Sequence, residues 1–292
     1  MRIATLTVKY PANKWWYIFA SIIKKRRMVA HLPETWEEVP RSKLKQIFKV
    51  LSEQNEHGQK VTRIRLLRVL LPWRARIFYS IPKEEVLQKL EPCVGWILKS
   101  PLAIPVVPVL WAGWQRWRLP ASNAADMTLG QYLTIEKELS KLKTEPDLPS
   151  LLAAILRPDT TETQHTLEDT GVLPNASRSA RRLWANKLAK MNPAYQYYVI
   201  NYWLAQVEYL QATYPHFFKK EEKQAGGKSK PMDWDSIPAR IAEIGIFGTV
   251  SQVQRVPVRM YLAWANSHAQ DKAQPEESLQ DIIRANHNKF LS

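Results

Sequence analysis

Gly226, Gly227, Lys228 and Ser229 are the residues of this sequence that come nearest to a phosphate-binding loop. Such a loop has a further glycine five residues before its Gly-Lys-Ser core, a strand entering it and a helix leaving it, so that backbone N–H groups surround the phosphates. In this chain Glu222 occupies the position of that glycine, within a charged segment. The sequence therefore predicts no nucleotide cofactor here.

A second set of residues has the types that suit metal ligation. Glu162, His165, Glu168 and Asp169 lie close together, but a catalytic metal needs ligands that rigid elements and further hydrogen bonds hold in place. We interpret residues 159–178 as a long polar loop, which would leave these side chains solvated. No nucleophile motif is readable either. We therefore expect no catalytic residues, no metal, no cofactor and no enzymatic activity.

Basic residues of the N-terminal third could neutralise phosphates, with Trp73 and Tyr79 stacking on bases. Residues 1–80 hold 17 Lys and Arg against 5 Asp and Glu, which gives 17 − 5 = +12 of the formal net charge of +15. No nucleic-acid-binding signature accompanies them. Both a nucleic-acid surface and a solvated or protein-facing surface therefore remain open for these candidates: Lys24, Lys25, Arg26, Arg27, Arg63, Arg65, Arg68, Arg74 and Arg76.

Trp111, Trp114 and Trp117 recur at a spacing of three residues beside a proline-broken apolar segment. Tryptophan fills cores, and it also concentrates binding energy at protein interfaces. These three residues are therefore either part of the core or an anchor patch for a partner protein.

Composition narrows the class of protein. The chain has 292 residues, of which 45% are hydrophobic, so it is long enough to bury a sizeable core. Cys93 is the single cysteine, which excludes an internal disulfide and agrees with the cytoplasm. The apolar run at residues 15–23 is too short to span a membrane, and the run at 94–114 is interrupted by Lys99 and by prolines. We expect neither secretion nor membrane insertion.

Residues 128–158 carry the clearest secondary-structure signal. Thr128 and Gln131 lie at capping-box spacing, and an apolar stripe at intervals of three and four follows them. A second stripe begins after the break at residues 145–147 and ends at Arg157 and Pro158, where proline cannot continue a helix. The pattern predicts an antiparallel helix pair in the core of an α-helical domain, with its charged positions in solvent.

The remaining elements follow from the same periodicities. The sequence predicts strands at residues 3–10 and 28–32 that pair with each other, and an extended segment at 94–114. It predicts helices at residues 42–53, 62–71, 81–90, 178–191, 193–214, 237–244 and from 257 onward, with a capping box at 249–252. The expected fold class is mainly α, with a helical bundle-like body and a small N-terminal β element.

Breaks in this pattern suggest a domain organisation. We expect a basic N-terminal region at residues 1–120, a central helical domain at 121–218, a charged linker at 219–231, a C-terminal helical module at 232–270 and a polar tail at 271–292.

Two parts of the chain resemble known proteins. The motifs Leu32-Pro33-x-x-Trp36, Thr128-Leu129-Gly130-Gln131-Tyr132-Leu133 and Leu151-Leu152-Ala153-Ala154-Ile155-Leu156-Arg157-Pro158 resemble a group of phage and prophage proteins from the Bacteroidetes lineage. Residues 234–264, with Ile241-Ala242-Glu243-Ile244-Gly245 and Pro257-Val258, look like the C-terminal part of tail-assembly chaperones. The basic N-terminal third has no counterpart in this resemblance.

The resemblance implies a non-enzymatic, chaperone-like protein of phage tail assembly. Such a protein would bind a tape-measure or tube protein of the tail in the host cytoplasm before assembly. Two alternatives remain open. The first is a nucleic-acid-binding protein that uses the basic N-terminal third, and the second is a structural component of the virion.

Overall fold

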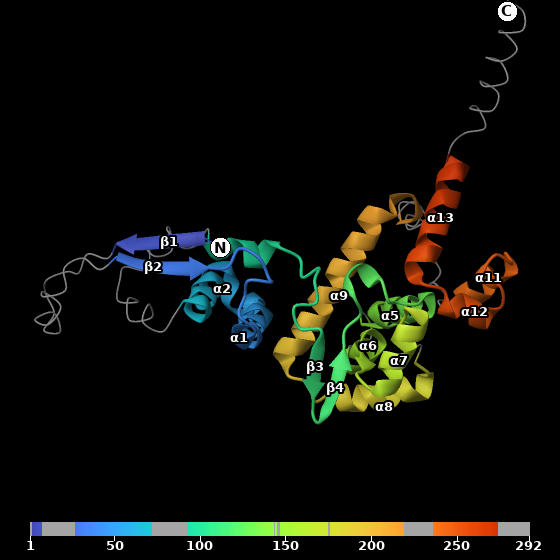
Figure 1. Ribbon diagram of the computed structural model, residues 1–292, viewed down its shortest axis with the longest axis horizontal. Coiled ribbons are helices and arrows are strands. Elements are labelled where there is room, and N and C mark those ends of the chain that lie inside the picture. The colour runs from blue at the N-terminus through green and yellow to red at the C-terminus, as the bar shows by residue number, and fades with distance from the viewer. Residues whose placement is uncertain are drawn as a thin grey trace, which may run out of the picture. The chain divides into compact units, whose positions relative to one another are not determined.

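The computed structural model describes residues 2–7, 27–71, 93–142, 144, 147–174, 176–218 and 236–273, and these residues are mainly α-helical (Figure 1). The chain divides into two compact units. The first unit comprises Met1–Val107 with Met191–Tyr202, and the second comprises Pro108–Lys190 with Trp203–Ser292. The expected helix at residues 81–90 and the expected linker at 219–231 lie outside the described residues.

The first unit contains the small N-terminal β element that the sequence predicts. Strand β1 (Arg2–Thr7) pairs antiparallel with β2 (Arg27–Leu32), in a register that sets Arg2 opposite Leu32 and Thr7 opposite Arg27. Helices α1 (Arg41–Ser52) and α2 (Gln54–Leu70) follow. Gly58 has a φ of 72° and a non-helical conformation, so that α2 is interrupted one turn after it begins.

Aromatic side chains build the core of the first unit. Phe48 of α1 stacks on Tyr198 at a centroid distance of 4.5 Å, and Trp36 meets Trp96 edge to face at 5.3 Å. The Trp96 indole donates to the Pro33 carbonyl at 2.8 Å, and the Tyr198 hydroxyl accepts from the Val107 N–H at 3.0 Å. Burial raises the pKa of Tyr198, so this phenol stays neutral.

Residues 93–99 are helical, and residues 101–108 have no regular structure. The extended segment expected at 94–114 is therefore wrong at its start, which is helical, and correct near its end, where residues 109–112 form a strand. The second unit begins with a hairpin that the sequence analysis did not foresee. Strands β3 (Val109–Ala112), β4 (Gln115–Arg118) and β5 (Arg157–Pro158) form an antiparallel sheet in the order β3-β4-β5.

The helix pair at the centre of the second unit confirms the prediction for residues 128–158. Helices α5 (Leu129–Lys141) and α6 (Leu148–Ile155) begin at caps whose side chains, Thr128 and Asp147, accept from backbone N–H groups. The expected capping box is only half formed. The Gln131 side chain donates to the Ile155 carbonyl at 3.1 Å instead of accepting from the backbone N–H of Thr128. This bond joins the two helices.

Helix α7 (Thr161–Thr170) occupies the stretch for which the sequence analysis expected a loop, and that expectation was wrong. Thr160 caps the helix by accepting from the Thr163 N–H at 3.2 Å, and Gly171 ends it with a φ of 68°. The Thr166 hydroxyl donates to the carbonyl of Glu162, four residues earlier, at 2.9 Å. A threonine thus caps the helix and another bonds within it, whereas the abundance of threonine was interpreted as a loop signal.

Helix α8 (Arg178–Leu188) confirms the predicted basic helix, and α9 (Pro193–Thr213) confirms the predicted helix that is largely apolar. The C-terminal module consists of α11 (Ile237–Glu243), α12 (Val250–Arg255) and α13 (Val258–Ala273). Thr249 and Gln252 form the complete capping box that the sequence predicts.

Backbone bonds fix the module to the start of α5. The Leu129 N–H donates to Val256 at 2.8 Å, and the Val258 N–H donates to Met127 at 2.9 Å.

Candidate functional site

The β3–β4 hairpin separates the three predicted tryptophans. In the register of the sheet Leu110 lies opposite Trp117 and Trp111 lies opposite Arg116, so the two pairs occupy opposite faces. Trp117 is fully buried, with its ring 6.0 Å from that of Trp184 in an edge-to-face arrangement. Trp111 is 58% exposed, and Trp114 is 99% exposed. Trp117 therefore belongs to the core and is inaccessible to a partner, which corrects its place in the predicted anchor patch.

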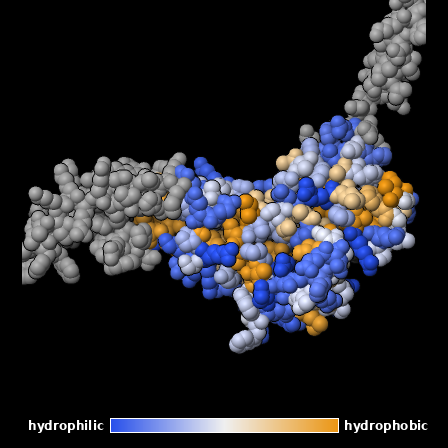
Figure 2. Space-filling view, viewed as in Figure 1, coloured by the Kyte–Doolittle hydropathy of each residue, from blue (hydrophilic) through white to orange (hydrophobic). Residues whose placement is uncertain are grey.

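A tight turn holds Trp114 in solvent. Ala112 pairs with Gln115, which leaves Gly113 and Trp114 as a two-residue loop. Gly113 has a φ of 60°, as the first position of the primed turns that suit hairpins requires. In Figure 2 the tip of the hairpin projects from the surface in the pale colour of intermediate hydropathy. The largest side chain of the turn is thus presented on a short, hydrogen-bonded support.

A pocket of about 740 Å³ adjoins this tip and is called the aromatic pocket below. The hairpin contributes Trp111, Trp114 and Arg116, the last turn of α8 contributes Lys187, and Lys190 lies in the turn after that helix. The Lys187 ammonium donates to the Gln115 side chain at 2.9 Å, which joins α8 to the hairpin. The pocket therefore combines an exposed aromatic surface with basic side chains.

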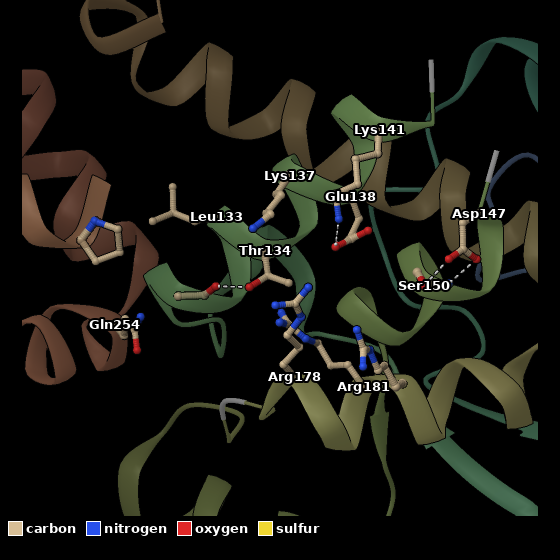
Figure 3. Close-up of a pocket in the computed structure, with 13 residues that line it drawn as sticks. Leu133, Thr134, Lys137, Glu138, Lys141, Asp147, Ser150, Arg178, Arg181 and Gln254 are labelled. Carbon is tan, nitrogen blue, oxygen red and sulfur yellow. Dashed lines mark hydrogen bonds and ion pairs between the residues drawn. The ribbon is translucent and has the colours of Figure 1, made fainter. Parts of the chain in front are cut away.

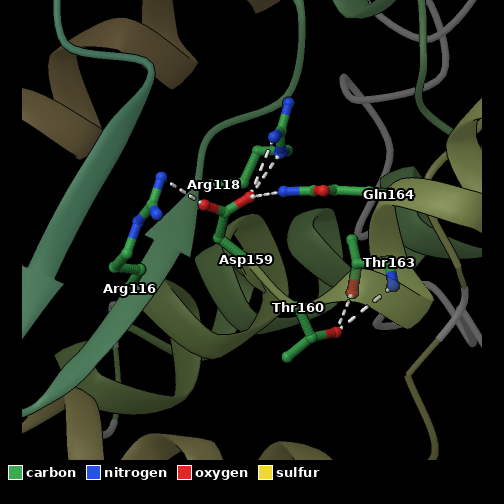
Figure 4. A network of polar contacts seen from close by, with 6 residues as sticks. All are labelled: Arg116, Arg118, Asp159, Thr160, Thr163 and Gln164. Atoms are coloured by element: carbon green, nitrogen blue, oxygen red, sulfur yellow. Dashed lines mark hydrogen bonds and ion pairs between the residues drawn. The ribbon is translucent and has the colours of Figure 1, made fainter.

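Asp159 is the acidic residue of this pocket, and two arginines neutralise it (Figure 4). Its carboxylate is inaccessible to solvent and lies 2.8 Å from Arg116 and 2.8 Å from Arg118. Gln164 of α7 donates to the same carboxylate at 3.3 Å. Burial alone would raise the pKa of Asp159, but the hydrogen bonds from Arg118 and Gln164 and the charges of both arginines hold that pKa below its ordinary value. The carboxylate therefore stays ionised and fixes β4 to the start of α7.

Arg157 is a second buried ionic residue. It is 1% exposed and donates to the carbonyls of Pro174, Ala154 and Leu156 at 2.8, 3.0 and 2.9 Å. Burial, and then the charge of Arg181, lower the pKa of Arg157 to about 9. Because its bonds satisfy carbonyls at the C-terminal end of α6, we assign it a structural role.

Sequence reasoning missed both residues. Arg157 and Asp159 were treated as the end of a helix and the start of a loop, since each local pattern fits that interpretation. The available signal was the alternation of Arg116 and Arg118 about a tryptophan, which marks a strand with one buried face and a charged opposite face. The arginine partners of Asp159 lie on β4, and Arg118 is 41 residues away from it in the chain, beyond the reach of local patterns.

The predicted basic surface is only partly within the described residues. Arg63, Arg65 and Arg68 lie on α2, where Arg65 forms an ion pair with Glu53 and Arg68 is exposed. Arg27 begins β2, and its side chain lies outside the described residues. The other predicted members lie wholly outside them: Lys24, Lys25, Arg26, Arg74 and Arg76. A nucleic-acid role for this surface stays a prediction.

The candidate metal ligands lie on the surface of α7. His165 and Glu168 are 70% and 75% exposed, with 3.8 Å between the imidazole Nδ1 and the carboxylate. Within the described residues no group of three or more His, Cys, Asp or Glu side chains is placed to hold a metal ion. The glycine-lysine-serine stretch at 226–229 lies outside these residues.

The C-terminal module has an exposed apolar surface of its own, visible in orange over α11 and α12 in Figure 2. The exposed side chains here include Ile244 at 55%, Ile246 at 57% and Val250 at 43%. None of them lines the aromatic pocket.

Comparisons with known proteins give no relative for this chain. No family model matches it, and neither a curated protein nor a solved structure matches it. Among the helices that the structure describes, none combines the length and the apolar character needed to cross a membrane.

Proposed function

We propose that this chain is a non-enzymatic interaction protein that binds a partner protein at the aromatic pocket. The exposure of Trp114, at 99%, is the observation that carries the proposal. A tryptophan side chain buries about 150–250 Å² when it is covered, so leaving it in water is unfavourable. Covering Trp111 and Trp114 with a partner removes this exposed area, as at the aromatic anchors of protein interfaces.

The charges around the pocket indicate the chemistry of the partner. Arg116, Lys187 and Lys190 line it, while the acidic Asp159 is already neutralised by arginines. An apolar or aromatic anchor flanked by carboxylates complements such a surface, because the anchor covers the indoles and the acids meet the basic rim. The partner is therefore expected to present an acidic, apolar segment.

The resemblance to phage tail-assembly proteins supplies the biological setting of the proposal. In that setting the partner is a tape-measure or tube protein of a phage tail, and binding takes place in the host cytoplasm before assembly. A mainly α fold with a helical C-terminal module fastened to α5 is compatible with this setting.

Co-expression tests the proposal directly. The chain is produced with the tail genes of its own locus, and the complex is recovered on a tagged copy. We expect a tail protein to co-purify with the wild type and to be lost from the Trp111→Ala/Trp114→Ala variant. Leu183→Ala is the matched control, because Leu183 is 64% exposed on α8 and does not line the aromatic pocket. Recovery of no tail protein with the wild type would exclude the tail setting.

A nucleic-acid-binding protein is the second candidate, and the formal charge of +12 in residues 1–80 favours it. It predicts that the full chain binds a DNA or RNA oligonucleotide with an affinity that falls steeply with salt, since phosphate neutralisation releases counterions. Arg63→Gln/Arg65→Gln/Arg68→Gln should reduce this salt dependence. Binding that does not change with salt would remove this candidate.

A structural virion component is the third candidate. Purified particles distinguish it from a chaperone, because a chaperone leaves before the particle is complete. Detection of the chain in purified particles at a fixed ratio to tail proteins would favour the structural role.

A further inference from the structure

A second cavity, of about 670 Å³, lies where α5, the beginnings of α6 and α8, and the C-terminal module meet (Figure 3). Its walls include Thr134 and Lys137 of α5, Arg178 of α8, Pro238 of α11 and Gln254 of α12. None of its lining residues belongs to the aromatic pocket. Its volume falls within the range of about 300–1,000 Å³ that is usual for small-molecule sites.

The lining of this basic cavity is strongly cationic. Five of its residues are basic and two are acidic, which gives 5 − 2 = +3. Both acids are engaged locally: Glu138 forms an ion pair with Lys141 at 2.9 Å, and Asp147 caps α6 by accepting from the Ser150 N–H at 3.2 Å. The five basic residues lie on two helices: Lys137 and Lys141 on α5, and Arg178, Arg181 and Arg182 on α8.

Helical geometry directs these cations toward the same space. Arg178, Arg181 and Arg182 are related by three and four positions, so they share one face of α8, and Lys137 and Lys141 are four positions apart on α5. Figure 3 shows the guanidinium of Arg178 reaching toward α5 and the ammonium of Lys137 pointing into the space between the two helices. Like charges that line one cavity repel one another, and a bound anion relieves that repulsion.

We propose that the basic cavity binds a ligand that carries two or more phosphate groups. Guanidinium groups donate two parallel hydrogen bonds to a phosphate and remain charged at neutral pH, which favours phosphate on a surface that has three arginines. A ligand with several phosphates also matches the excess charge of +3 and reaches both helices. This site is independent of the partner surface at the hairpin.

Titration calorimetry with inorganic tripolyphosphate tests the proposal on the full chain at low salt. We expect saturable binding by the wild type and at least tenfold weaker binding by Arg178→Gln/Arg182→Gln. Both arginines are exposed, so the substitutions remove charge without disturbing the core, and the melting temperature checks this. Arg41→Gln/Arg259→Gln is the matched control, because it removes the same charge from exposed positions that do not line the cavity.

Three further arms decide the interpretation. Equal weakening by the two double variants would show a general charge effect and would overturn the proposal. Equally tight binding of a hexaglutamate peptide would overturn the choice of phosphate. A single-stranded oligonucleotide that competes with tripolyphosphate would support the site and identify a nucleic acid as the phosphate source, whereas no competition would support a small phosphorylated molecule. Trp114→Ala should leave tripolyphosphate binding unchanged, so failure here is separable from failure of partner binding.

Discussion

Replacing the three tryptophans of the hairpin one at a time should separate binding from folding. Trp111→Ala and Trp114→Ala remove exposed side chains, and Trp117→Ala removes a buried one. The first two substitutions are expected to weaken partner binding. Trp114→Ala should change the free energy of unfolding by less than about 0.5 kcal/mol. Trp111→Ala should lower it by at most about 2 kcal/mol, because Trp111 is 58% exposed and the rest of its side chain is already buried. Trp117→Ala is expected to lower the free energy of unfolding by about 3–5 kcal/mol, because it leaves a large cavity in the core.

The exposed fractions set the order of the binding effects. A tryptophan side chain has an area of about 200 Å². Trp114 is 99% exposed and offers about 200 Å² for burial, whereas Trp111 is 58% exposed and offers about 120 Å². At about 25 cal/mol per Å² these areas correspond to upper limits of about 5 and about 3 kcal/mol. Ordering of the interface reduces both. We expect losses of about 3 kcal/mol for Trp114→Ala and about half of that for Trp111→Ala, which is about 100-fold and about tenfold in Kd.

Biolayer interferometry with the tail protein recovered by co-expression measures these affinities, and urea denaturation measures the stabilities. The reasoning would be refuted if the folded Trp111→Ala and Trp114→Ala variants bound the partner as tightly as the wild type. It would also be refuted if Trp117→Ala proved as stable as the wild type, since the burial of that side chain would then have no energetic consequence.

Three further predictions concern the sheet and its supports. Asp159→Asn should lower the free energy of unfolding at pH 7 by about 2 kcal/mol, because it removes the ion pair with Arg116 and the charge that strengthens the hydrogen bonds from Arg118. The pKa of Asp159 lies below its ordinary value of 3.8. The stability that Asp159 contributes is therefore present above pH 3.8 and is lost as the pH falls through the lowered pKa. Urea titrations from pH 6 to acid should show a smaller decline in the free energy of unfolding for Asp159→Asn than for the wild type. Arg157→Ala should cost about 3 kcal/mol in the same assay, since it removes the guanidinium that donates to the carbonyls of Leu156 and Pro174, and an unchanged midpoint would contradict its structural role. Gly113→Ala should lower the free energy of unfolding by about 1 kcal/mol. The cost comes from backbone strain alone, because no atom lies within 4 Å of the added methyl group. Gly95→Ala is the control, because φ is not positive at Gly95.

Much of the helical content was predictable because its signals are local. The caps at Thr128 and Thr249, the apolar stripe of α1 and the nearly continuous apolar character of α9 all act within a few residues, and the structure confirms each of these helices. The N-terminal strand pair was also predicted correctly. The domain boundaries and the partner remain predictions.

The sequence by itself thus determined a mainly α chain with a basic N-terminal third and a set of aromatic residues available for binding. Only the tertiary structure decided how those residues are used. Trp111, Trp114 and Trp117 have the same chemistry and even spacing, but pairing with β5 and packing against Trp184 bury Trp117 alone. Burial and charge pairing depend on contacts between residues far apart in the chain, and a local pattern contains no information about which distant residues will be the partners.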